Sequence, residues 1–295
     1  ILPIVAYFQL PTDTNFLQGL SDIDPSLINI WGDGGFNLLN AFSVIGLLSI
    51  GIGFLGSPQV YVRFIAIRDS AEIKKGKIVA VLYTLITSSS AVVIGMLGRF
   101  MFTTSNQSPE LALGVAGENV LYLLLIEIMP DVVVGFYIAA LLSAVMSTVD
   151  SLLVVASSAV TIDFYQQIIN PKADSKLLVS LSKKVTLTLA FFALFVAISV
   201  SFLSPNRTIF WFVIFGWSGI AATFCPVIIL SIFWKNLSEY GAIASMVTGF
   251  LSIPLFKFFV PKINIIGQYF EKLDVLLPSI ILALLAGYAV SLYKK

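Results

Sequence analysis

The sequence contains seven apolar runs, each about as long as a helix needs to cross a bilayer. A hydrocarbon core of about 30 Å requires roughly 20 mostly apolar residues in a helix. Of the 295 residues, 58% are hydrophobic and 11% are charged, which is unlike a soluble domain. The sequence therefore predicts an all-α, polytopic membrane protein. The runs lie near residues 37–57, 78–103, 132–158, 185–203, 209–234, 240–256 and 275–293.

One further apolar stretch, residues 118–129, is too short to cross a bilayer. It carries Glu118 and Glu127, so we expect a helix that lies in the membrane interface. The next span is then expected to begin at Pro130 or Asp131.

The distribution of basic residues predicts the orientation of these spans. Loops 58–77 and 159–184 carry several Lys and Arg residues, whereas loops 12–36 and 104–131 carry none. Because Lys and Arg concentrate in cytoplasmic loops, we expect the basic loops and the C-terminus in the cytoplasm. Loop 257–274 lies outside in this arrangement although it holds three lysines. The predicted location is the cell membrane, crossed many times.

The residues that the chain lacks exclude several classes of function. It has no histidine, which excludes Ser-His and Cys-His catalysis and histidine zinc sites. Its single cysteine, Cys225, excludes an internal disulfide framework. Asp150 and Asp163 fall on one predicted helix instead of facing each other, which disfavours an intramembrane enzyme. The net charge of +1 gives no reason to expect nucleic acid as a partner. We also expect no enzyme activity and no cofactor.

The segment from Gly51 to Pro58 contains a GxGxxG pattern, but its context contradicts dinucleotide binding. The glycines stand at the end of an apolar span, with no βαβ unit around them. Two interpretations remain. Glycines and a proline weaken a membrane helix, so that freed backbone groups face a substrate. Alternatively, the glycines allow close helix packing.

The span at 140–165 is rich in hydroxyl groups, and Ala144, Ser147 and Thr148 fall on one helix face. Two hydroxyls and a backbone carbonyl offer three oxygens to a small cation. Ser and Thr in membrane helices also commonly bond the carbonyl four residues back, which needs no ion. Asp150 is an acid inside this span, and we keep it as a candidate for ion coupling or as a structural acid bonded to nearby hydroxyls.

A third segment, from Phe215 to Pro226, combines small residues with a proline inside an apolar span. Two interpretations are open for it as well. One is close helix packing with a kink at the proline, and the other is contact with a solute.

Three segments together resemble the sodium:solute symporter family, and within it the sodium/proline symporters. The segments are GFLGSPQVYVRFIAIRDS at 53–70, SAVMSTVDSLLVVASSAVTIDFY at 143–165 and GWSGIAATFCPVIILSIFWKNLSEYGAIASMVTG at 216–249. In the last segment, Asn236 stands where the family signature has a basic residue, and Lys235 lies one place early. The positions that fit that signature are Ser231, Ile232, Gly241, Ala242 and Gly249.

The resemblance implies a transporter core of two inverted repeats of five helices, with solute and sodium near the bilayer midplane. Residues 1–36 would be the tail of a preceding helix and an extracytoplasmic loop. Residues 37–234 would form the second repeat, and residues 235–295 two C-terminal transmembrane helices. The partners implied are the lipid bilayer and the missing N-terminal helices of the same transporter. Sodium, the coupling ion, would bind at Ala144, Ser147 and Thr148.

The resemblance also implies solute contacts at Ile50, Phe54 and Pro58. Proline carriers have Trp and Tyr at the first two positions, so Ile50 and Phe54 leave proline itself open. The function implied is sodium-coupled symport of a small organic solute, with proline or a related amino acid as the first candidate. The alternative is a truncated, non-transporting membrane fragment or accessory subunit.

Overall fold

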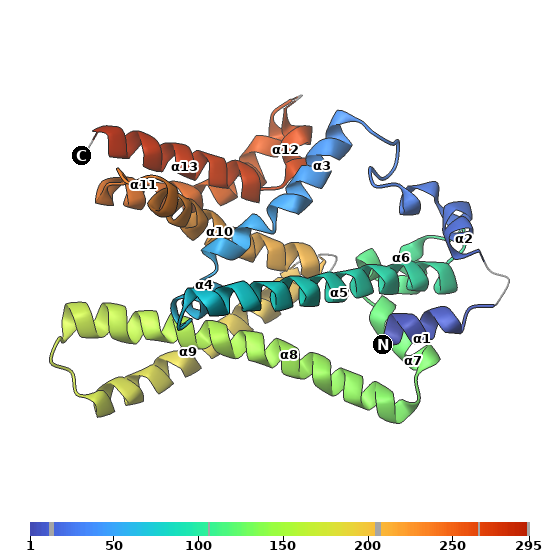
Figure 1. Cartoon of the computed structure of the whole chain (residues 1–295), viewed down its shortest axis with the longest axis horizontal. Helices are drawn as coiled ribbons and strands as arrows, with labels where there is room; N and C mark the ends of the chain where they lie inside the picture. Colours follow the sequence, from blue (N-terminus) through green and yellow to red (C-terminus); the bar gives the residue numbers. More distant parts are fainter. Residues whose placement is uncertain (12–14, 106, 204–207, 265, 294–295) are drawn as a thin grey trace. The chain divides into compact units, whose positions relative to one another are not determined.

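The chain folds into helices joined by short connections, as the computed structural model shows for residues 1–11, 15–105, 107–203, 208–264 and 266–293 (Figure 1). No strand occurs within these ranges. Contacts divide the chain into two compact units, which we describe separately. One unit comprises Ile1–Leu124 and Thr208–Lys295, and the other comprises Leu125–Arg207.

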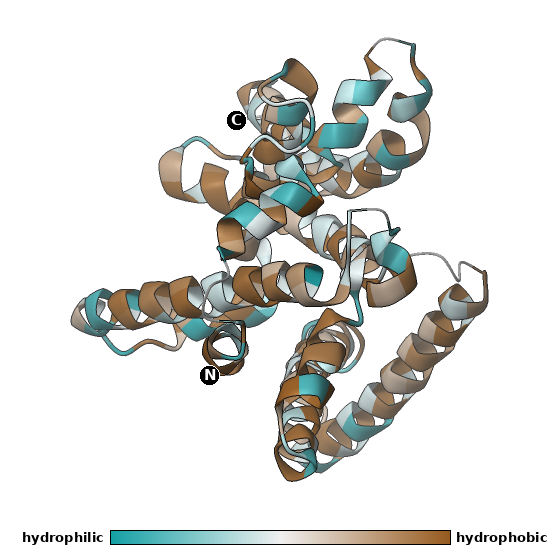
Figure 2. Ribbon diagram, turned by 90° about the vertical axis from the view of Figure 1, so that its right-hand side faces the viewer, coloured by the Kyte–Doolittle hydropathy of each residue, from teal (hydrophilic) through white to brown (hydrophobic). Residues whose placement is uncertain are grey.

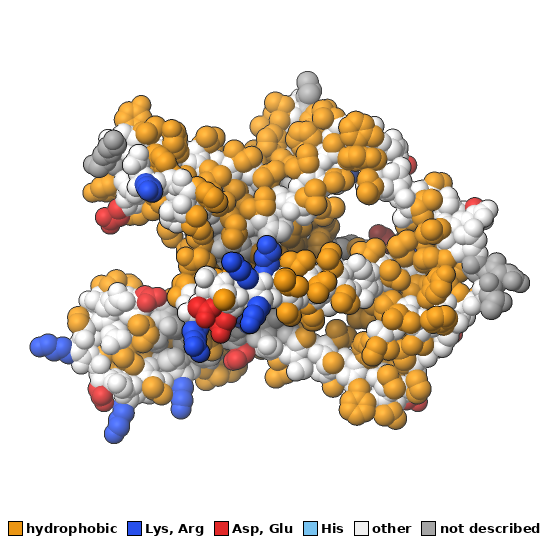
Figure 3. All heavy atoms as spheres, in the orientation of Figure 1, with side chains coloured by type: hydrophobic (Ala, Val, Ile, Leu, Met, Phe, Trp, Pro, Cys, Tyr) orange, Lys and Arg blue, Asp and Glu red, His pale blue; other side chains and the backbone are white. Residues whose placement is uncertain are grey.

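Seven helices of the described part are long and apolar enough to cross a membrane, and each overlaps one predicted run. Hydrophobic residues dominate the helices (Figure 2), and hydrophobic side chains cover much of the face seen in Figure 3. This confirms the prediction of an all-α, polytopic membrane protein. The seven segments are Leu38–Gly56, Ser70–Phe102, Asp131–Ile169, Ser175–Leu203, Ile209–Phe233, Glu239–Lys262 and Leu276–Tyr293.

Helices extend beyond the apolar runs, so segment 58–77 is largely not the loop that the sequence suggested. It contains α4 (Pro58–Ile65), and α5 (Ser70–Phe102) already begins there. The Asp69 side chain accepts hydrogen bonds from the Ala71 and Glu72 amides at 2.8 and 2.9 Å, which starts α5 before its apolar part. Apolar length alone does not report a helix that continues into a polar stretch.

The unit Leu125–Arg207 is built on a long helical hairpin. α8 (Asp131–Ser158) continues as the π-helix η4 (Ala159–Ile169), and α9 (Ser175–Leu203) returns along it. The Ser157 hydroxyl donates to the Ser182 carbonyl at 3.1 Å and so ties the two arms together. Because η4 ends at Ile169 and α9 begins at Ser175, the connection between them is far shorter than the loop predicted over 159–184.

The short apolar stretch before α8 is helical, as predicted. It forms α7 (Val120–Ile128), and α8 begins at Asp131 with Pro130 as its N-cap residue. The described part also contains α6 (Pro109–Leu113) and the 3-10 helix η3 (Val115–Gly117) in the connection before α7.

Three helices of the other unit, α10 (Ile209–Phe233), α11 (Glu239–Pro254) and α13 (Leu276–Tyr293), pack closely on one another. Small residues make this approach possible, because a side chain on Gly241 would collide with Ser291 and Gly287 of α13. The buried apolar cluster that holds these helices together comprises Ala221, Ala222, Cys225, Ile253, Val275, Leu276 and Ile280.

A short helix, α12 (Gly267–Leu273), lies against α3 (Leu38–Ser49) of the same unit. A Cβ on Gly46 would lie 2.5 Å from the Leu273 carbonyl oxygen, so only glycine permits this contact. Other elements of the unit are α1 (Leu2–Phe8), α2 (Phe16–Ile23), η1 (Pro25–Ile28), η5 (Leu255–Phe259) and η6 (Val260–Lys262).

Candidate solute and sodium sites

The first long span is interrupted shortly after α3. A 3-10 helix, η2 (Ile52–Gly56), follows it, and there hydrogen bonds reach back three residues instead of four. The Gly53 amide, for example, donates to the Ile50 carbonyl at 3.1 Å. The helix is therefore interrupted here, as one of the two interpretations of the sequence expected.

Pro58 fixes where the break ends. It occupies the first turn of α4, where its missing N–H group would have no helical acceptor in any case. A proline also disfavours helical geometry in the residue before it, and Ser57 has φ −81° and ψ 112°. The chain thus leaves η2, passes through one extended residue and starts a new helix.

The glycines of η2 pack against one face of α10. A Cβ on Gly53 would lie 3.0 Å from the Ala221 Cβ, and one on Gly56 would lie 2.7 Å from the Cys225 amide nitrogen. The Cys225 thiol also contacts the Ile52 carbonyl oxygen at 3.5 Å. The helix is therefore broken and its glycine face is closely packed, as the two interpretations expected, while contact between the freed backbone groups and a substrate stays a prediction.

The proline of α10 frees a carbonyl group that a neighbouring helix covers. Pro226 has no N–H, so it cannot donate to the Ala222 carbonyl four residues back. Gly249 of α11 packs directly on this carbonyl, and any side chain there would collide with it. This contact supports close helix packing at the Pro226 end of the segment from Phe215 to Pro226, and contact of the rest of the segment with a solute stays a prediction.

The three predicted solute residues lie along the break, one in each of its parts. Ile50 is the C-cap residue of α3, Phe54 lies in η2, and Pro58 begins α4. Of the three, only Phe54 lines a small cavity of about 250 Å³ beside the break. That cavity is also lined by Gly51, Leu55, Val60, Tyr61 and Phe64.

Sequence reasoning missed Tyr61 and Phe64, which face this cavity from the first two turns of α4. A usable signal was present, since two aromatic residues at i and i+3 directly after a helix-breaking proline share one face. Among the described residues that line the cavity, Tyr61 alone brings a side-chain hydroxyl.

Several polar side-chain atoms at the break are buried without a hydrogen-bond partner among the described residues. They are the Ser57 hydroxyl, the Gln59 amide oxygen and the Trp217 indole nitrogen. A buried polar group without a partner costs about 1–3 kcal/mol, so such groups are uncommon unless a ligand or water serves them. The break therefore combines an apolar cavity with unsatisfied polar groups.

The predicted sodium residues lie on α8, within the unit Leu125–Arg207. Ala144, Ser147 and Thr148 are all exposed on this unbroken helix. The Thr148 hydroxyl donates to the Ala144 carbonyl at 3.2 Å, which is the bond that needs no ion. α8 thus offers two hydroxyls on one face, and a cation would need further oxygens from another element.

Asp150 is likewise exposed on α8, and no ion pair joins it to a described residue. The hydroxyls nearest to it in sequence are those of Ser147 and Ser151, and Ser151 donates instead to the Thr148 carbonyl at 2.8 Å. The carboxylate therefore lies beside the predicted sodium residues without a described basic partner, and its role stays a prediction.

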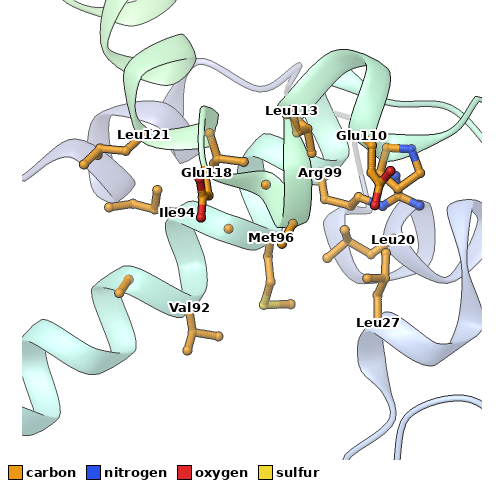
Figure 4. A pocket seen from close by; sticks show the side chains of 17 residues that line it. Leu20, Leu27, Val92, Ile94, Met96, Arg99, Glu110, Leu113, Glu118 and Leu121 are labelled. Carbon is orange, nitrogen blue, oxygen red and sulfur yellow. The ribbon is translucent and has the colours of Figure 1, made fainter. Parts of the chain in front are cut away.

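A larger cavity, of about 670 Å³, lies elsewhere in the first unit, between the end of α5 and the segments that contain α2, α6 and η3 (Figure 4). Its wall is mostly apolar and includes Arg99, Glu110 and Glu118. One guanidinium nitrogen of Arg99 is buried without a partner among the described residues. Hydrogen bonds from Ser26 lower the pKa of Asp24, and the charge of Arg99 lowers it slightly further.

Glu118 has a structural partner, because its carboxylate accepts a hydrogen bond from the Ile209 amide at 2.6 Å. Ile209 is the first residue of α10, so the negative charge lies at the positive end of that helix. The arrangement fixes the connection before α7 to the start of α10 within the first unit.

Comparison with known proteins assigns the family. The family model described as "Sodium:solute symporter family" matches residues 1–249, which is most of the chain. This chain belongs to the sodium:solute symporter family. The resemblance drawn from the three sequence segments is therefore confirmed.

Similar curated proteins include bacterial transporters. The osmoregulated proline transporter OpuE of Bacillus subtilis is 29% identical over 298 residues, covering 100% of this chain and 56% of the relative. The high-affinity proline transporter PutP of Bacillus subtilis is 31% identical over 255 residues, covering 84% and 50%. Sodium/proline symporter 2 of Staphylococcus saprophyticus is 30% identical over 299 residues, covering 100% and 55%. This symporter-family chain spans about half the length of these relatives.

Proposed function

We propose that the complete protein couples the inward movement of sodium to the uptake of a small organic solute across the cell membrane. Family membership supports this proposal, and the observation that carries it is the broken helix between α3 and α4. Membrane transporters place solutes at such breaks, because the interrupted helix leaves backbone and side-chain groups free to bind polar ligands. Proline or a related amino acid is the first candidate, since similar proteins are proline transporters or sodium/proline symporters by name.

The sodium site we propose lies on α8, with Ala144, Ser147 and Thr148 as ligands. The Ala144 carbonyl and the two hydroxyls would supply three oxygens, and the missing N-terminal helices of the same transporter would supply the others. Sodium would favour one conformation of the carrier through its differential affinity for the two states. The coupling is reciprocal, so bound sodium raises the affinity for solute and bound solute raises the affinity for sodium.

The orientation we propose places the C-terminus in the cytoplasm, since basic residues gather in the segments assigned to that side. Catalysis forms no part of the proposal. No cofactor is needed, because the sodium gradient supplies the driving force.

The test is uptake of radiolabelled L-proline by the complete protein in proteoliposomes, with and without an inward sodium gradient. We expect accumulation that requires the gradient and collapses when an ionophore dissipates it. A panel of other amino acids and pantothenate, offered as competitors of L-proline uptake and as labelled solutes, then defines the solute. Failure of every panel solute to accumulate would overturn the proposal.

This chain alone serves as a second arm of the same experiment. A site shared between inverted repeats cannot close from one half, so we expect no uptake by the isolated chain. Sodium-dependent uptake by that chain would contradict the division into repeats at residue 37.

A further inference from the structure

Trp217 of α10 points a hydrogen-bond donor at the helix break. Its indole N–H is buried and has no partner among the described residues. An indole nitrogen can only donate, so whatever satisfies it must present an acceptor such as a carboxylate or carbonyl oxygen. Trp217 is neither one of the predicted sodium residues nor one of the three predicted solute residues.

The position of the indole ties it to the candidate solute residue Phe54. The two rings lie with their centroids 4.7 Å apart and their planes at 61°, in an edge-on contact. The absence of a side chain on Gly53 leaves room for the indole, since a Cβ there would lie 2.7 Å from its nitrogen. All three residues belong to the same unit of the structure.

The neighbourhood of the indole is otherwise committed to packing. Ala221 and Cys225, one and two turns further along α10, are buried against the glycine face of η2. Ser218, the next residue, donates its hydroxyl to the Ile214 carbonyl at 2.7 Å. Trp217 is thus the residue of this stretch of α10 that brings a free donor to the break.

We propose that Trp217 is a residue that determines solute selectivity, with its indole N–H donating to an oxygen of the solute bound at the helix break. The proposal rests on the proposed function and adds a requirement to it. The solute must carry an acceptor oxygen, such as an amino-acid carboxylate, that reaches the break while an apolar part of the solute lies against Phe54. A site built to donate a hydrogen bond rejects analogues that lack the acceptor.

The experiment compares Trp217→Phe with Trp211→Phe in the complete protein. The first change removes the buried donor and keeps an aromatic ring. The second removes an indole from the same helix at an exposed position, where the ring contacts Phe210. Initial uptake of radiolabelled L-proline is measured against proline concentration at saturating sodium, and then against sodium concentration at saturating proline.

We expect Trp217→Phe to raise the KM for L-proline at least tenfold, while the maximal rate and the sodium dependence stay within twofold of the parent. Trp211→Phe should match the parent in all three. A packing role predicts a different pattern, because a disturbed helix break would lower the maximal rate or alter the sodium dependence together with KM.

A second variant keeps the test decisive if Trp217→Phe fails to fold. Gly53→Ala leaves the indole in the protein but displaces it, because the new methyl group would lie 2.7 Å from its nitrogen. The methyl group would also lie 3.0 Å from the Ala221 Cβ, so the variant is compared with Gly56→Ala, which crowds α10 without approaching the indole. The same rise in KM is expected of Gly53→Ala.

The outcomes separate the two proposals. If the parent takes up L-proline by sodium and both variants keep its KM, the inference about Trp217 is wrong and the proposed function stands. A fall in maximal rate with unchanged KM would also overturn the inference. Absence of sodium-driven uptake of every solute by the parent overturns both.

Discussion

Gly56 is the position where the close approach of the helix break to α10 can be tested by a single methyl group. In Gly56→Ala the new Cβ would lie 2.7 Å from the Cys225 amide nitrogen and 3.0 Å from the Ala221 carbonyl oxygen. Both are backbone atoms of a helix, so they cannot swing aside as a flexible side chain can. The 2.7 Å contact with the Cys225 nitrogen is shorter than real Cβ contacts, so it must lengthen, which requires η2 and α10 to move apart.

The cost follows from overpacking. Forcing an extra methyl group into a close-packed interface costs typically about 1–3 kcal/mol, because neighbouring groups leave their preferred positions. A loss of this size lowers an apparent melting temperature by several degrees, at roughly 2–4 °C for each kcal/mol. The φ of Gly56 is not positive, so the penalty is steric and not conformational.

Gly51→Ala is the matched control within the same break. Its Cβ would have the Leu48 carbonyl oxygen as nearest neighbour at 3.5 Å, an ordinary contact. Its backbone suits alanine, with φ −60° and ψ −34°, so the control should be neutral or stabilising by about 0.4–1 kcal/mol.

The assay is the monodisperse fraction of the purified complete protein after heating, measured by size-exclusion chromatography. A local readout is the reaction of the buried Cys225 thiol with a maleimide dye below the melting temperature, with other cysteines of the complete protein replaced. Gly56→Ala should melt earlier and expose Cys225, and Gly51→Ala should do neither. Equal melting and equal labelling of the two variants would refute the close approach of η2 to α10.

Three further predictions address the sodium residues, the start of α10 and the orientation. Ser147→Ala and Thr148→Ala should each weaken the apparent sodium affinity at least tenfold, or about 1.4 kcal/mol, in uptake measured against sodium concentration. Glu118→Ala should lower the stability by about 1 kcal/mol, seen as earlier melting, because the amide at the N-terminus of α10 loses its charged acceptor. A cysteine introduced at Lys75 should react only with a membrane-impermeant reagent applied from the cytoplasm, and one at Asn15 only from outside.

Each of these three predictions has its own control. Ser90→Ala removes a hydroxyl from α5, away from the predicted ligands in sequence, and should leave sodium dependence unchanged. Parental sodium dependence in both alanine variants on α8 would remove the sodium assignment. Glu118→Gln keeps an acceptor, so melting as early as that of Glu118→Ala would contradict the hydrogen bond to Ile209. Labelling requires a parent without other reactive cysteines, and reversed labelling would invert the orientation.

The spans and the helix break could be predicted from the sequence because their causes are local. A run of about 20 apolar residues suffices to identify a span, and glycines followed by Pro58 identify the break. The extension of α5 back to Ser70 could not be predicted in the same way. It depends on the Asp69 cap and on polar turns that a search for apolar runs passes over.

The candidate site was harder to predict from the sequence, because it is formed by packing between segments that are distant in the chain. Phe54 could be named from its place in the break, but its contact with Trp217 depends on how η2 lies against α10. No sequence pattern indicates that the indole N–H of Trp217 lacks a hydrogen-bond partner among the described residues. The assignment of residues 37–234 to one repeat, and of the solute and sodium residues to their roles, stays a prediction.

The two glycines of the family signature hold helices at short distances. Gly241 lies against Ser291 and Gly287, and Gly249 lies on the carbonyl that Pro226 leaves free. A sequence pattern built on such contacts records the spacing of α10, α11 and α13 and carries no information about the solute. Under the proposed function, attempts to redirect solute preference in the complete protein should keep these glycines fixed and vary the side chains around the break.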